Sequence, residues 1–393
     1  MGTNSATMGT ADSSSSGDAT VTVTATATET ATESGSATEA TESSGVTDST
    51  SSDGGSTGGS SSGGSSDGGT TGAVSASDSN SETGVDPNCE APGDLISCDA
   101  GTDDPFQAMG LGCVGNANQV IPIANTVFSS PDAGAWRIAT QLGSFIDPVS
   151  NAPLFSPREG DSFLVISSGL IVAPDGQGVI TMDDFDTYNT NGNPDVNVLP
   201  APMTTIDGSN NGAGGTPFVN CDGVNDCSDT IESQWGLGNS DPEDMLWFQF
   251  DTQVPGGTNG WAVDFAYFSV EFPEWVDTEF NDIFLVWSDS ETYTGNLCFV
   301  NDQPCTVTAL WPVAYQENSP ELAGTGFQSG GGGTGWFTMQ GSAAPGETLQ
   351  LTTAIFDMGD SALDTLVLLD NWRWDCEGCV PSEVMGCGIE PTQ

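Results

Sequence analysis

Beyond about residue 160, short hydrophobic runs alternate with clusters of Gly, Pro, Asn and Asp. In the clearest run, Trp261, Val263, Phe265 and Tyr267 are separated by single residues, which is the period-two pattern of a half-buried strand. The segment 348–355 repeats this pattern, and the Gly- and Pro-rich segments between the runs are typical of turns. Many short strands joined by turns predict an all-β fold, a β-sandwich of jelly-roll type.

The hydrophobic runs that we expect to form strands share β-branched or aromatic residues and turn residues at both ends: 162–167, 170–173, 245–250, 261–272, 283–287, 306–311, 335–340, 348–356 and 365–369. Helical turns are expected only around residues 135–142.

The composition changes once, near residue 85. Residues 1–85 are nearly all Ser, Thr, Gly, Ala, Asp and Glu, with no aromatic residue and no cysteine. Such a segment cannot bury enough hydrophobic surface to offset the entropy of ordering, so we expect a long disordered stalk. We divide the remainder into a Cys-rich lead-in over 86–117, a β-sandwich domain over 118–375 and a Cys-rich tail over 376–393.

The charge of the chain excludes several partners. Its 55 acidic residues face only three basic ones, Arg137, Arg158 and Arg373, and the net charge is −52. Binding of DNA or RNA requires clustered cations, so nucleic acid is excluded, and anionic membrane surfaces are excluded for the same reason. No stretch of about 18 hydrophobic residues occurs, so we expect no transmembrane segment.

The chain has no histidine and no lysine. Ser-His-Asp and Cys-His catalysis, His-ligated zinc and a P-loop are therefore excluded. Glycoside hydrolysis by carboxylates stays open, with Glu271 and Glu274 as the candidate pair. Residues three apart in an extended segment face opposite ways, which weakens that pair.

Ten cysteines in an acidic, loop-rich chain indicate an oxidising compartment. We expect two local disulfides, Cys221–Cys227 and Cys298–Cys305, because each pair brackets a short loop. The other six cysteines allow 15 connectivities, among which spacing does not choose. They lie at the ends of the predicted folded region: Cys89, Cys98, Cys113, Cys376, Cys379 and Cys387.

Two motifs in the second half of the chain resemble the bacterial choice-of-anchor L domain. Residues 271–276 and 280–284 fit E-[FY]-P-E-[FYW]-V and F-N-D-x-F, and residues 354–364 fit A-I-x-D-x-G-D-S-x-x-D. Residues 159–173 resemble an earlier segment of that family, and the resemblance covers about 115–375.

This resemblance implies an extracellular β-domain on an exported surface protein, held by one of varied anchors and without established catalytic activity. The Cys-rich tail departs from the family, because no sorting signal follows it. The first residues have neither the basic nor the hydrophobic region of a signal peptide. Either the export signal lies upstream of Met1, or the chain is the mature form from which the signal has been removed. We expect the anchor to be a lipidated cysteine upstream of Met1.

The acidic residues of the two motifs suggest a Ca²⁺ site. Acidic and amide residues crowd both motifs, each beside a hydrophobic strand: Glu271, Glu274, Asp277, Glu279, Asn281 and Asp282 in the first, and Asp357, Asp360 and Asp364 in the second. The ligands that we expect are Glu274, Asn281, Asp282, Asp360 and Asp364. Close carboxylates repel one another, and Ca²⁺ accepts six to eight oxygen ligands. The alternative is that these side chains cap turns and accept hydrogen bonds from local backbone amides.

Together these features predict a non-enzymatic binding or adhesion module at the outer cell surface. Its partner would be a glycan or a protein, and Ca²⁺ would stabilise the domain. The alternative is a carboxylate-dependent glycoside hydrolase.

Overall fold

The structure is a computed structural model. It describes residues 89–116, 118–130, 132–185, 198–205, 230–237, 242–300, 303–359, 361–380 and 389–391. The predicted stalk, the Cys221–Cys227 pair and Asp360 lie outside these ranges.

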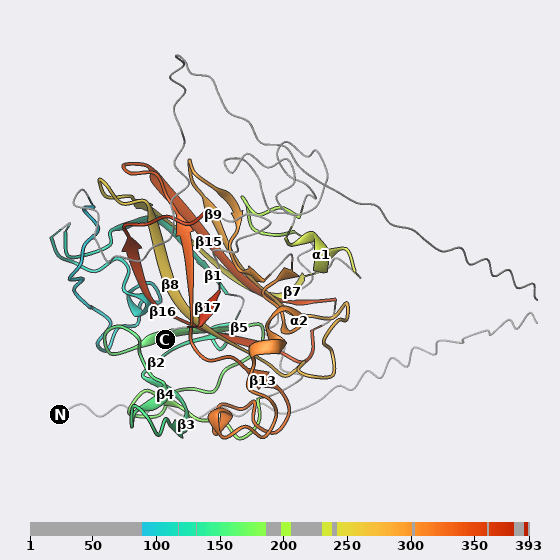
Figure 1. Cartoon of the computed structure of the whole chain (residues 1–393). Helices are drawn as coiled ribbons and strands as arrows, with labels where there is room; N and C mark the ends of the chain where they lie inside the picture. The colour runs from blue at the N-terminus through green and yellow to red at the C-terminus, as the bar shows by residue number, and fades with distance from the viewer. Residues whose placement is uncertain are drawn as a thin grey trace, which may run out of the picture. The chain divides into compact units, whose positions relative to one another are not determined.

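Two large antiparallel sheets dominate the described residues (Figure 1). The first has the strand order β1 (Ile123–Ser129), β7 (Pro242–Gln253), β15 (Thr348–Met358), β9 (Ile283–Asp289) and β10 (Thr294–Asn296). The second has the order β17 (Glu390–Pro391), β14 (Phe337–Ser342), β8 (Gly260–Ser269), β16 (Thr365–Asp375), β5 (Phe163–Ser167) and β2 (Trp136–Ala139), with β13 (Gly332–Gly333) also pairing β8.

The two sheets share one hydrophobic core. Phe248 of β7, Leu351 of β15 and Phe284 of β9 pack in the same buried cluster as Phe265 of β8 and Val367 of β16. Because each strand directs alternate side chains to one face, these residues follow the period-two pattern in the sequence. The predicted all-β sandwich is confirmed.

A third, smaller sheet covers the outer face of the second one. It has the order β4 (Pro153–Phe155), β3 (Gln141–Ile146) and β6 (Val179–Ile180), and it lies at the lower end of Figure 1. Phe155 packs edge-on against Phe268 of β8, with ring centroids 4.9 Å apart. The strand of Trp261 to Tyr267, predicted to be half-buried, is β8. That prediction is wrong: every residue of β8 is buried, because both of its faces are covered.

Three local predictions fail for identifiable reasons. Residues 306–311, predicted as a strand, contain the helix α2 (Val307–Leu310), where the Thr306 hydroxyl caps the helix by accepting from the Ala309 N–H. The helical turns expected at 135–142 are the strands β2 and β3, and 170–173 form no strand. In each case tertiary packing or a cap overrides a short local pattern.

The remaining elements are short: α1 (Glu232–Trp235), β11 (Phe299–Val300), β12 (Gln303–Pro304) and the 3₁₀ turns Gln107–Met109, Trp311–Val313 and Pro320–Leu322. Among the described residues, no helix has the length and hydrophobicity that crossing a bilayer requires.

The Cys-rich lead-in packs into the main core. Phe106 makes edge-on ring contacts with Phe128, Phe248 and Phe250. The Cys89–Cys376 disulfide joins the start of the lead-in to the end of β16, across 287 positions of sequence. Segments from both ends of the domain thus stabilise the same sandwich.

Candidate functional site

Buried acidic side chains gather at one end of the sandwich, where strands of both sheets begin or end. Asp282 precedes β9, Asp357 lies near the end of β15, Asp364 precedes β16 and Glu271 follows β8. Each of the four is at most 1% exposed. We call Glu271, Asp282, Asp357 and Asp364 the acid cluster.

The strand register explains why Asp282 and Asp357 meet. Strands β9 and β15 are antiparallel, and Ile283 pairs with Phe356. One step further, Asp282 and Asp357 become opposite neighbours. The two buried carboxyl groups therefore lie close enough for their charges to repel each other. Such repulsion favours the protonated form of one of them.

Burial is the main cause that raises the pKa of Asp282 well above its ordinary value, and the negative charges of Asp357 and Glu271 raise it further. The carboxylate of Glu271 accepts a 2.9 Å hydrogen bond from the Asp282 backbone N–H. The Tyr267 hydroxyl donates to the Asp282 carbonyl oxygen at 3.3 Å. The cluster is therefore a sealed group of acids in which protonation of Asp282 is favoured.

Gly169 is required by this packing. A Cβ atom at position 169 would lie 2.0 Å from Oδ2 of Asp364, which is far inside van der Waals contact. Beside it, the Ser168 hydroxyl accepts from the Thr365 N–H at 2.9 Å and donates to Asp282 at 3.3 Å. The Ser-Gly pair after β5 thus brings that strand against the start of β16 and against the acid cluster.

The side chain of Asn281 is used for hydrogen bonds to the backbone. Its side-chain amide donates to the carbonyl oxygens of Trp275 and Thr278 at 2.8 and 2.9 Å. Its Oδ1 accepts from the backbone N–H of Thr308 at 3.2 Å and from the Thr308 hydroxyl at 2.5 Å. These bonds close the loop between β8 and β9, as the turn-capping alternative expects.

The predicted Ca²⁺ ligands are thus brought together only in part. Asp282 and Asp364 lie in the acid cluster, whereas the side chain of Glu274 is exposed. Asp360 lies outside the described residues. Among the residues that the structure describes, no three acidic or cysteine side chains are arranged to hold a metal ion. The sequence placed Glu271 and Asp357 among the crowded acids but not among the expected ligands.

The candidate hydrolase pair is divided between interior and surface. Glu271 is 1% exposed and faces the Asp282 backbone, while Glu274 is exposed. A glycosidase needs two carboxyl groups that flank one substrate bond. Because Glu271 is sealed, this pair does not have that arrangement.

Three disulfides are described. Cys298–Cys305 joins the loop that the sequence predicted, with Cα atoms 5.4 Å apart, so that prediction is confirmed. Of the six cysteines whose pairing the sequence left open, four form the disulfides Cys89–Cys376 and Cys98–Cys113. Cys379 is also in a disulfide, and no described cysteine is free.

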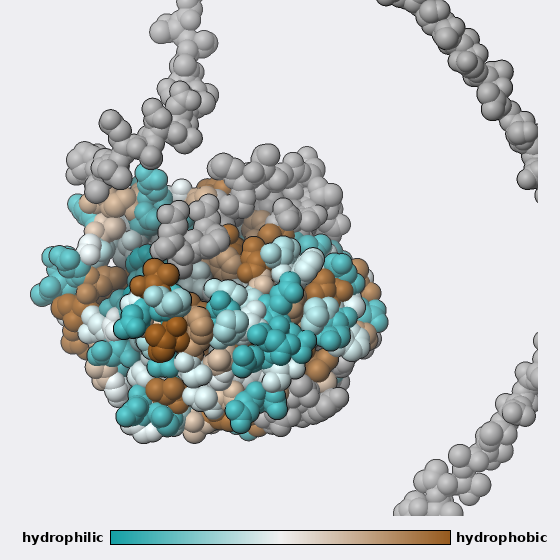
Figure 2. Space-filling view, turned by 60° about the horizontal axis from the view of Figure 1, so that its bottom comes forward, coloured by the Kyte–Doolittle hydropathy of each residue, from teal (hydrophilic) through white to brown (hydrophobic). Residues whose placement is uncertain are grey.

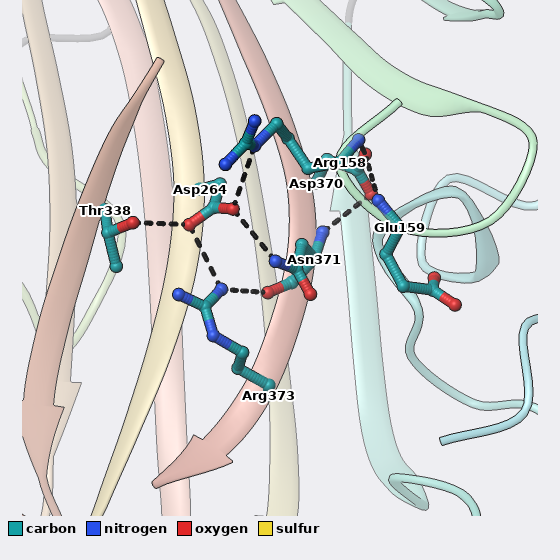
Figure 3. A network of polar contacts seen from close by, with 7 residues as sticks. All are labelled: Arg158, Glu159, Asp264, Thr338, Asp370, Asn371 and Arg373. Atoms are coloured by element: carbon teal, nitrogen blue, oxygen red, sulfur yellow. Dashed lines mark hydrogen bonds and ion pairs between the residues drawn. The ribbon is translucent and has the colours of Figure 1, made fainter. Parts of the chain in front are cut away.

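A second buried acid has a different environment. Asp264, in the middle of β8, is 1% exposed and lies between two of the three arginines of the chain. Its Oδ1 is 3.0 Å from a terminal nitrogen of Arg373, and its Oδ2 is 3.4 Å from Nε of Arg158. The Thr338 hydroxyl and the Asn371 amide donate to it at 2.7 and 2.9 Å (Figure 3).

The strands around Asp264 explain this convergence. An extra residue in β16 between Asp370 and Arg373 shifts its register with β8, and both Asn371 and Arg373 reach Asp264. Asp370 accepts from the backbone N–H groups of Arg158 and Glu159 at 2.6 and 3.2 Å (Figure 3). This anchors the segment that carries Arg158.

The sequence contains a signal for this network. Asp264 interrupts an otherwise hydrophobic strand, and a charge in such a strand must be paired or hydrogen-bonded. With only three arginines in the chain, few partners were available.

Comparison of the chain with known proteins found no match: no family model fits the sequence, and no curated protein or solved structure is significantly similar. The resemblance to the choice-of-anchor L domain therefore stays a prediction.

Proposed function

We propose that this chain is an exported, surface-held binding or adhesion module that acts without catalysis. The observation that carries the proposal is that every described cysteine is in a disulfide, including one bond that joins the two ends of the domain. Such disulfides persist in oxidising compartments and are rare in the cytosol. The strong negative charge also suits a protein that must stay soluble outside the cell.

The placement of the acids supports binding over hydrolysis. The acid cluster is sealed from solvent, and the Glu271–Glu274 pair does not share a surface. Asp264 is likewise buried and neutralised by arginines. These carboxyl groups lie inside the sandwich, so its loops and outer faces are left for a glycan or protein partner.

The proposal includes Ca²⁺. It would bind at the acid cluster in place of the proton that the raised pKa of Asp282 favours. Ca²⁺ requires oxygen ligands, and carboxyl groups of Asp282, Asp357 and Asp364 lie at neighbouring strand ends. Binding would require these side chains to turn toward a common point and to release the proton. The affinity for Ca²⁺ should therefore increase with pH.

Surface exposure is tested by digesting intact cells of the source organism with proteinase K and following the chain with an antibody. Amine-reactive labels are unsuitable because the chain has no lysine. We expect loss of the chain while a cytoplasmic marker stays intact. Protection of the chain in intact cells, with digestion after lysis, would contradict surface exposure.

Binding without catalysis is tested with the purified full chain and isolated cell envelopes. We expect saturable retention of the chain and no release of reducing sugar. Release of sugar that Glu271→Gln abolishes would instead establish the hydrolase.

A further inference from the structure

A groove of about 620 Å³ crosses the lower end of the domain, between the β3–β4 hairpin and the start of β14. Its volume lies within the range that small-ligand sites occupy. Its lining combines aromatic, aliphatic, hydroxyl and charged side chains: Asp147, Ser150, Ala152, Pro153, Leu154, Ser156, Arg158, Val313, Tyr315, Gly335, Trp336 and Phe337.

The polar side chains of this groove are held in place. Asp147 accepts from the backbone N–H groups of Val149 and Ser150 at 3.0 and 3.1 Å. The backbone of Tyr315 exchanges two hydrogen bonds with Gly333. Arg158 is held by Asp264 through Nε, and within the described residues its terminal nitrogens contact no other acceptor. A ligand would therefore meet ordered hydrogen-bonding groups.

Tyr315 supplies the accessible aromatic surface. It is half-buried, whereas Trp336 and Phe337 are only 6% and 4% exposed and form the floor. Burial is the main cause that raises the pKa of the Tyr315 hydroxyl, and the charges of Glu321 and Asp147 raise it further. The phenol thus stays protonated and can donate a hydrogen bond over the groove.

The charge of the groove selects among ligands. One carboxylate, Asp147, and one guanidinium, that of Arg158, give a locally balanced lining in a chain of net charge −52. Anionic ligands are repelled by the whole molecule, and cationic ones are attracted to many other places on its surface. Figure 2, which brings the lower end of Figure 1 forward, shows hydrophobic and hydrophilic residues in small alternating groups without one large hydrophobic patch.

From this lining we infer that the groove binds a neutral saccharide, with one sugar ring against Tyr315 and its hydroxyl groups bonded to Asp147 and Arg158. This inference rests on the proposed binding function and names its ligand class. An aromatic face beside a carboxylate and a guanidinium suits the mixed hydrophobic and hydroxyl surface of a pyranose.

The test measures binding of the purified full chain to neutral hexasaccharides of glucose, mannose and xylose by calorimetry, with hyaluronan and alginate as anionic probes. We expect at least one neutral hexasaccharide to bind and the anionic probes not to bind. Tyr315→Ala should weaken binding about tenfold or more, as removal of a central aromatic contact does. Ala152→Trp, which fills the groove without removing a side-chain hydrogen bond, should also abolish it.

Trp275→Ala is the matched control, because Trp275 is an exposed aromatic residue outside the groove, 37% accessible. It should leave binding unchanged. Neutral-sugar binding that survives both groove variants, or binding of the anionic probes alone, would overturn the inference. If no sugar binds while the chain still binds cell envelopes, this inference fails and the proposed function stands.

Discussion

Asp264 and Asp282 are both 1% exposed, yet the chain stabilises them in different ways. Asp264 contacts the guanidinium groups of Arg158 and Arg373. Asp282 lies among other acids, and its burial together with the charges of Asp357 and Glu271 raises its pKa well above the ordinary value. The charge of Asp264 is balanced by two guanidinium groups, whereas the raised pKa of Asp282 favours a bound proton.

This difference follows from the scarcity of basic residues. With three arginines in the whole chain, two of them at Asp264, few cations are left for the acid cluster. A buried carboxyl without a cation lowers its cost of burial by keeping a proton. The Asp264 site also reaches a groove, because Arg158 lines it. The cation-paired site thus contributes to a surface, whereas the acid cluster is where we expect responses to pH and to Ca²⁺.

The largest effect is expected from Asp264→Ala. The variant removes the acceptor of two guanidinium and two neutral hydrogen bonds. Both arginines are about one-third exposed and can regain water, so we expect a loss of about 2–4 kcal/mol in the free energy of unfolding. Denaturant unfolding measures it. Asp103→Ala, an exposed acid, should change stability by less than about 0.5 kcal/mol, and equal losses in both would contradict the pairing.

Ca²⁺ should affect the acid cluster and not Asp264. At a concentration one hundred times its dissociation constant, a ligand of the folded state stabilises it by about 2.7 kcal/mol. The melting temperature should rise by roughly 5 °C or more in Ca²⁺ relative to chelator, and by less in Mg²⁺. Asp282→Asn should abolish the rise and Glu274→Gln should preserve it. An equal rise in NaCl of matched ionic strength would show screening instead of binding.

Asn281→Ala tests whether Asn281 holds its loop in place or binds Ca²⁺. The variant removes one donor to the carbonyl oxygens of Trp275 and Thr278 and the side-chain acceptor of the Thr308 N–H, so we expect a loss of about 1–3 kcal/mol. Asn116→Ala, at an exposed position, should be nearly neutral. The rise in melting temperature caused by Ca²⁺ should persist in Asn281→Ala, and its disappearance would make Asn281 a ligand.

The sequence predicted the sandwich because strands such as β15 carry a strong period-two pattern. It also placed Asp282 and Asp364 near one another, since both adjoin hydrophobic strands. It placed Asp357 among the acids of the second motif but not among the expected ligands, because only the register of β15 with β9 brings that residue opposite Asp282. It also missed the burial of both faces of β8, which depends on a third sheet whose strands are short and weakly patterned.

The contrast between the two sites is tested most directly by the pH dependence of the free energy of unfolding in chelator. The pKa of Asp282 is raised in the folded chain, so its contribution is fully present below the ordinary pKa of an aspartate, near pH 4, and is lost as pH rises through the folded pKa. Between the ordinary pKa and the folded pKa of Asp282, the free energy of unfolding falls by about 1.4 kcal/mol per pH unit.

Asp282→Asn should remove this decline, and the variant should equal or exceed the wild type in stability at neutral pH. Asp103→Asn controls for the loss of one charge and should keep the wild-type decline. The contrary result is that the free energy of unfolding of Asp282→Asn changes with pH in parallel with that of the wild type from pH 4 to pH 8. Asp282 would then carry no proton, and the distinction between the two sites would be wrong.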